Sequence, residues 1–118
     1  MKSPLGALIG LTVCMLSACT GLSDDLRRAE TAFSEARYED VEVWLEELER
    51  DVPRMPSEQR ARYYYLAGMS AYRIGARAPA RHALALCREE LADAPGALPP
   101  GYLRNLRAAL EDLARSPR

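Results

Sequence analysis

Apolar side chains recur every three or four residues along most of this chain, which is the spacing of one face of an α-helix. The periodicity predicts five helices, covering about residues 23–36, 41–51, 57–74, 78–91 and 100–115. In the fifth, Leu103, Leu106, Leu110 and Leu113 form one stripe. β-branched residues are scarce after Val52, which argues against a sheet. We therefore expect an all-α domain of antiparallel helical hairpins over residues 23–115, with the fifth helix covering an open face.

The first 18 residues have a different pattern. Lys2 precedes a short apolar run that ends at Leu16, and about 20 apolar residues are needed to cross a bilayer. This arrangement is typical of a cleaved secretory signal. The run ends in Leu16-Ser17-Ala18-Cys19, which resembles the bacterial lipobox. The resemblance implies removal of residues 1–18, lipidation of Cys19 with a diacylglycerol and an N-acyl chain, and a short tether at 19–22. An ordinary signal peptide with an incidental cysteine is the alternative.

The same resemblance predicts the location of the chain. In Gram-negative lipoproteins, an aspartate after the lipidated cysteine favours retention in the inner membrane, and this chain has Thr20 there. The expected location is the outer membrane, with the domain facing the periplasm. Each buried methylene contributes about 0.8 kcal/mol, so two or three acyl chains anchor a protein almost permanently.

Residues 60–91 resemble a tetratricopeptide repeat. Tyr64 stands at the large aromatic position of the repeat, Ala67-Gly68 at its Leu-Gly position, and Gly75 at its turn. The small, bulky and small positions of the second helix are filled by Ala80, Leu84 and Cys87. A generic helical bundle, in which these small residues simply permit close packing, is the alternative.

The first helical pair is a weaker match to the same repeat. Ala29 stands at the small contact position, and Pro53 closes the unit. Ala29 and Gly68 lie 39 residues apart, against a family period of 34. The extra residues are expected in a loop between Val52 and Ser57.

The repeat resemblance also implies a concave groove on the third predicted helix. The residues that would line it are Arg62, Tyr65, Met69, Tyr72 and Arg73. Arginine and aromatic side chains are common at protein-binding surfaces, because they offer contact area and planar hydrogen bonding. The alternative is that Tyr65, Met69 and Tyr72 belong to the core, which would make the bundle closed.

The net charge and the reactive residues of the chain limit the classes of function that we expect. The formal net charge is −1, so we expect no binding to nucleic acid. Acidic residues gather in 39–51 and arginines in 54–88, which fits solvated helix faces, complementary packing of the two helical pairs, or self-association. His82 is the only histidine and is predicted on the surface, and Cys87 is predicted to be buried. No motif for a metal, a cofactor or a nucleophile is present, and we expect no enzyme.

These features favour a membrane-anchored scaffold that binds an envelope protein or peptide. Self-association is a further expectation, because three or more repeats are normally needed for a stable array. One alternative is an accessory or pilot subunit of an envelope assembly or secretion complex. Another is a purely structural lipoprotein with a closed helical bundle.

Overall fold

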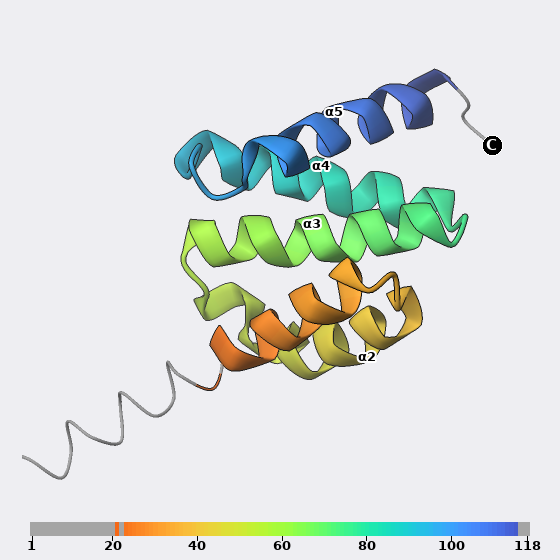
Figure 1. Ribbon diagram of the computed structural model, residues 1–118. Helices are drawn as coiled ribbons and strands as arrows, with labels where there is room; N and C mark the ends of the chain where they lie inside the picture. Colours follow the sequence, from red (N-terminus) through yellow and green to blue (C-terminus); the bar gives the residue numbers. More distant parts are fainter. Residues whose placement is uncertain (1–20, 22, 116–118) are drawn as a thin grey trace, which may run out of the picture.

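The computed structural model describes residues 21 and 23–115. Within this part of the chain, a first helix covers residues 23–34 and is followed by α2 (Tyr38–Leu48), the short 3₁₀ helix η1 (Glu49–Arg54), α3 (Ser57–Arg73), α4 (Arg77–Asp93) and α5 (Pro100–Arg115). The helices lie side by side, with α3 and α4 between the first helical pair and α5 (Figure 1). The described residues contain no strand, and the predicted all-α fold is confirmed.

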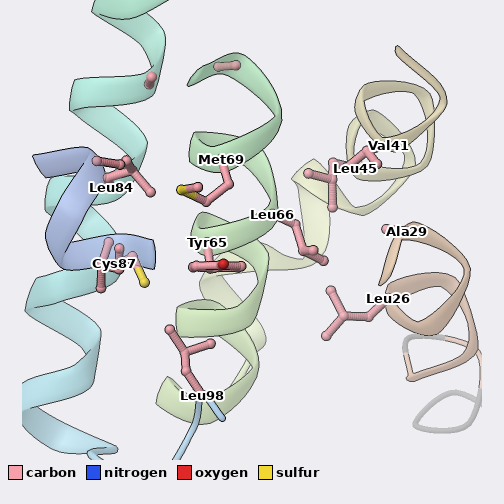
Figure 2. Packing of buried hydrophobic residues seen from close by; sticks show 14 of the residues in the cluster. Leu26, Ala29, Val41, Leu45, Tyr65, Leu66, Met69, Leu84, Cys87 and Leu98 are labelled. Atoms are coloured by element: carbon pink, nitrogen blue, oxygen red, sulfur yellow. The ribbon is translucent and has the colours of Figure 1, made fainter. Parts of the chain in front are cut away.

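The helix α3 is the centre of the domain and contacts α2, α4 and α5. Leu66 points toward Leu26 of the first helix, whereas Met69 points toward Leu84 of α4 (Figure 2). All four side chains are buried. Leu66 and Met69 therefore pack against different neighbouring helices. Because α3 is covered on two sides, it has apolar residues on more than one face.

The helices α3 and α4 approach each other closely at Gly68. A Cβ atom added there would lie 2.5 Å from Cδ2 of Leu84 and 3.1 Å from the backbone nitrogen of Leu84. These distances are shorter than van der Waals contact, so a residue larger than glycine would push the helices apart. Close packing at the small residues of this helical pair, which the sequence indicated, is confirmed at Gly68.

The turn between the first helix and α2 has the same backbone geometry as the turn between α3 and α4. Ala36 and Gly75, which lie 39 residues apart, both have a positive φ, of 59° and 84°. The N–H after each of them donates to the carbonyl five residues earlier, at 2.9 and 2.8 Å. Burial repeats at the same 39-residue offset, in the pairs Ala29 and Gly68, Val41 and Ala80, Leu45 and Leu84, and Leu48 and Cys87. The described chain therefore contains an internal structural repeat.

Two boundaries differ from the sequence prediction. The first turn lies at residues 35–37 rather than 37–40, because Ala36 takes the left-handed conformation without a glycine. The 3₁₀ helix η1 replaces the end of the predicted second helix and the start of the predicted loop, and it contains Pro53. The side chains of Val52 and Met55 are buried in the core, a tertiary contact that the prolines in the sequence do not indicate.

A short segment, residues 94–99, leads into α5. Ala97 and Leu98 of this segment are buried, and α5 adds Leu106, Ala109 and Leu113 to the core. The predicted fifth helix therefore packs on the α3–α4 pair. The predicted signal peptide and Cys19 lie outside the described residues. Among the helices that are described, none is long and apolar enough to cross a bilayer.

Candidate partner-binding surfaces

Two of the five predicted groove residues are in the core. Tyr65 is 0% exposed and Met69 is 2% exposed. Phe33 of the first helix and Tyr102 of α5 cover Tyr65, with ring centroids 5.9 and 4.4 Å from it. Phe33 and Tyr102 also touch each other, with their centroids 6.1 Å apart. The groove interpretation is therefore wrong for Tyr65, which the rings of Phe33 and Tyr102 cover, and for Met69, which points toward Leu84 of α4 (Figure 2).

The other three predicted groove residues remain partly accessible. Arg62 pairs with Glu30 of the first helix at 3.6 Å, and Arg73 is exposed at the end of α3. Tyr72 is half-buried, and its hydroxyl donates to Oδ2 of Asp112 at 2.8 Å. Arg62 and Tyr72 thus link α3 to its neighbours. A polar hollow of about 270 Å³ lies beside Arg62, lined by Ser23, Leu26, Arg27, Glu30, Gln59 and Arg62.

Polar contacts fasten α5 to the repeat pair. Asp112 accepts from Tyr72 of α3 and, at 3.2 Å, from Nη1 of Arg77 at the start of α4. The pKa of the Asp112 carboxyl lies below its ordinary value of 3.8. The largest cause is the hydrogen bond from Tyr72, and the second is the hydrogen bond from Arg77. The hydrogen bond between Tyr72 and Asp112 also raises the pKa of Tyr72. This group holds the C-terminal half of α5 against both helices.

An apolar groove lies on the outer side of α4 and α5. Its volume is about 460 Å³, and we call it the α4–α5 groove. Its lining residues are Arg88, Leu91, Leu103, Leu106, Arg107, Leu110, Glu111 and Ala114. Leu91, Leu103 and Leu110 are half-buried, and Ala114 is exposed. The sequence predicted the α5 leucines as one inward stripe, but Leu103 and Leu110 face this groove and only Leu106 and Leu113 are fully buried.

Three charged side chains border the α4–α5 groove. Arg88, Arg107 and Glu111 are exposed, and none of them has an ion pair with another described residue. The helices α4 and α5 run antiparallel (Figure 1), and Nη2 of Arg81 donates to the carbonyl of Leu113 at 3.3 Å. Arg88 of α4 and Arg107 of α5 both line the groove, so each of its two helices contributes an arginine to its border.

Charge segregation along the sequence does not produce matched packing of the two segments. Arg54 pairs with Asp51 at 3.0 Å, but Arg60 pairs with Glu90 at 2.9 Å and Arg77 with Asp112. The acidic side chains of α2 face solvent, among them Glu42, Glu46 and Glu47.

The reactive side chains Cys87 and His82 line neither the polar hollow beside Arg62 nor the α4–α5 groove. Cys87 is buried and its Sγ donates to the carbonyl of Ala61 at 3.3 Å, while burial raises its thiol pKa to about 12. His82 is exposed on α4. Both predicted placements are confirmed. Within the described residues, no group of three or more His, Cys, Asp and Glu side chains is placed to hold a metal ion.

No protein-family model, curated protein or solved structure matches this chain. Its function is therefore inferred from its own residues and their geometry.

Proposed function

We propose that this chain is a lipid-anchored envelope protein whose helical domain binds a protein helix in the α4–α5 groove. The observation that carries the proposal is an apolar groove between two antiparallel helices, bordered by charges without ion pairs in the described chain. Apolar centres with polar rims are typical of protein-binding surfaces. The lipobox-like Leu16–Cys19 supports the anchor, and Thr20 supports the outer membrane facing the periplasm.

The shape and charge of the groove indicate which kind of helix it would bind. An amphipathic helix fills a groove of this kind with apolar side chains at positions i, i+3, i+4 and i+7. Leu91, Leu103 and Leu110 would receive those side chains. Arg88 and Arg107 line the groove from its two helices and have no ion pair with another described residue, so the bound helix should carry a carboxylate that can pair with them.

The internal repeat supports the tetratricopeptide-like interpretation. The equal turns at Ala36 and Gly75, and the small residues Ala29 and Gly68 at the same offset, are features of stacked helical hairpins. In such an array α5 would be the first helix of a third unit. The α4–α5 groove is then the place where the second helix of that unit would pack.

A second candidate function is a structural lipoprotein whose bundle is closed. The burial of Tyr65 under Phe33 and Tyr102 favours it, because the face predicted as a groove is filled by the chain itself. This candidate predicts that substitutions in the α4–α5 groove leave every association of the protein unchanged.

Affinity isolation from solubilised membranes separates the two candidates. The full chain is compared with Leu110→Glu and with Ala114→Glu, whose wild-type side chain is exposed and can be replaced without opening the core. Val43→Glu is the matched control, because Val43 is 59% exposed on α2. We expect both groove variants to lose the proteins that co-purify with the wild type, while the control keeps them. Unchanged co-purification by a folded Ala114→Glu chain would overturn the proposal.

A further inference from the structure

Building on this proposed function, we infer that the helix bound in the α4–α5 groove is α5 of a second copy of this chain. The two copies would pack with their α5 helices antiparallel, related by a two-fold axis level with Ala109. Closed two-fold dimers are the commonest form of soluble homo-oligomer, and each surface in them meets itself. A surface can do this only if it carries its own complement, and the charges and side-chain sizes along α5 meet that condition.

The charges on α5 are self-complementary. Arg107 and Glu111 lie two residues before and two residues after Ala109. In an antiparallel pair centred on Ala109, Arg107 of each copy therefore lies opposite Glu111 of the other. Arg88 of α4 lines the same groove, so Glu111 of the other copy would enter a groove that has an arginine on each of its two helices. These are the three border charges that have no ion pair within the described chain.

The apolar residues are complementary in size. The same arrangement places Leu103 of one copy level with Arg115 of the other and one residue from Ala114, so the large leucine side chain lies beside a small one. Leu110 lies next to the axis and meets its own counterpart. Facing large and small residues interdigitate without leaving a void, which is how closely packed helix pairs fill space. Leu91 of α4 completes the apolar wall on each side.

The outward face of α2 fits the groove less well. It carries Glu39, Glu42, Glu46 and Glu47, and Val43 is its one strongly exposed apolar residue. A helix with a single valine cannot cover the leucines of the groove. Pairing of α5 with α5 therefore satisfies both the apolar and the charged parts of the surface, whereas α2 offers only charge.

Charge reversal on the full chain tests the arrangement. The lipidated protein in density-matched detergent is examined by sedimentation velocity as wild type, Arg107→Glu, Glu111→Arg and the double variant that exchanges the two charges. We expect a concentration-dependent dimer for the wild type and a rise of about tenfold or more in the dissociation constant for each single reversal. The double variant should recover the wild-type constant, because both intermolecular pairs are restored with opposite sign. Arg107 and Glu111 are exposed, so all variants should fold, which circular dichroism verifies.

Two results would overturn the inference. One is a wild-type chain that stays monomeric at every concentration, and the other is a double variant no better than the single reversals. Neither result decides the proposed function. If the wild type is monomeric and Ala114→Glu still abolishes co-purification of another protein, the groove binds a helix from a different partner.

Discussion

Gly68 shows how little space separates α3 from α4. In Gly68→Ala the new methyl group would meet the side chain and the backbone of Leu84, and the backbone cannot rotate away. We expect the free energy of unfolding to fall by about 1–2 kcal/mol, the overpacking cost reduced by the better helix propensity of alanine. Urea unfolding of an unlipidated Cys19→Ser chain measures the change.

A matched control is available at the start of α5. A methyl group on Gly101 would meet only Nη2 of Arg104, at 3.7 Å. Gly101→Ala should therefore leave the unfolding free energy unchanged or slightly raised. Equal destabilisation by both substitutions would mean that close packing at Gly68 is not the cause.

We expect the Cys87 thiol to be unreactive in the folded protein. Burial raises the pKa of its thiol from 9.0 to about 12, so the reactive thiolate is absent near neutral pH. Because the folded pKa is the higher one, the neutral thiol favours the folded state below pH 9.0, and this contribution is lost as the pH rises toward 12. At about pH 8 we expect a thiol reagent to leave Cys87 unmodified in the native chain and to modify it fully in urea. Rapid modification without denaturant would contradict the buried placement.

Tyr65 illustrates what helical periodicity leaves open at the scale of a residue. The pattern placed Tyr65, Met69 and Tyr72 together on α3, but it could not say which neighbour covers them. The cover of Tyr65 comes from Phe33 and Tyr102, which are distant in sequence and are brought over it by the packing of the first helix and α5. The close contact at Gly68 was predictable. Glycine inside a long helix lowers the stability of the helix, so it is expected where a neighbouring backbone has to come close.

Between elements, the contacts of Asp112 tie α5 to α3 and α4. Hydrogen bonds from Tyr72 and Arg77 lower the pKa of its carboxyl, so the ionised form favours the folded state. This stabilisation is present above pH 3.8 and is lost as the pH falls through the lower folded pKa. We expect Asp112→Asn to be less stable than the wild type at about pH 6 and to lose less stability between about pH 6 and pH 3, measured by urea unfolding at both values.

The control for this pH dependence is an exposed acid on α2. Glu47→Gln removes a carboxylate that has no ion pair within the described chain. It should keep the wild-type difference in stability between the two pH values. If Asp112→Asn and Glu47→Gln behave alike, the contacts of Asp112 do not hold α5 in place.

Element boundaries were predictable where a residue type marks them. Gly75 ends the α3 hairpin turn with a positive φ, and Pro100 begins α5. The turn at Ala36 was misplaced because an alanine adopts the conformation that glycine usually signals. The 3₁₀ helix η1 was missed because Pro53 predicts a loop, while the burial of Val52 and Met55 depends on tertiary contacts.

At the scale of the whole molecule, the all-α fold followed from the sequence but the α4–α5 groove did not. The leucines of α5 formed a stripe wide enough to serve two surfaces, and only the packing angle of α5 on α4 decides which of them turn outward. The apolar arc was therefore visible in the sequence, whereas its division into core and groove was not.

The proposed anchor makes a separate prediction for the whole chain. In Cys19→Ser the acyl chains cannot be attached, and no described helix is long and apolar enough to cross a bilayer. We expect the wild type to remain with the membrane fraction after a high-salt wash and Cys19→Ser to move to the soluble fraction. Retention of Cys19→Ser in the washed membranes would rule out the lipid anchor.

Site-specific photo-crosslinking in intact membranes tests the central claim most directly. A photo-reactive amino acid replaces Leu110 in the α4–α5 groove in one chain and the exposed Val43 on α2 in another. The account predicts a discrete crosslinked protein product from the Leu110 position, of twice the chain mass if the partner is a second copy, and none from the Val43 position. Equal products from both positions, or none from the Leu110 position, would contradict it.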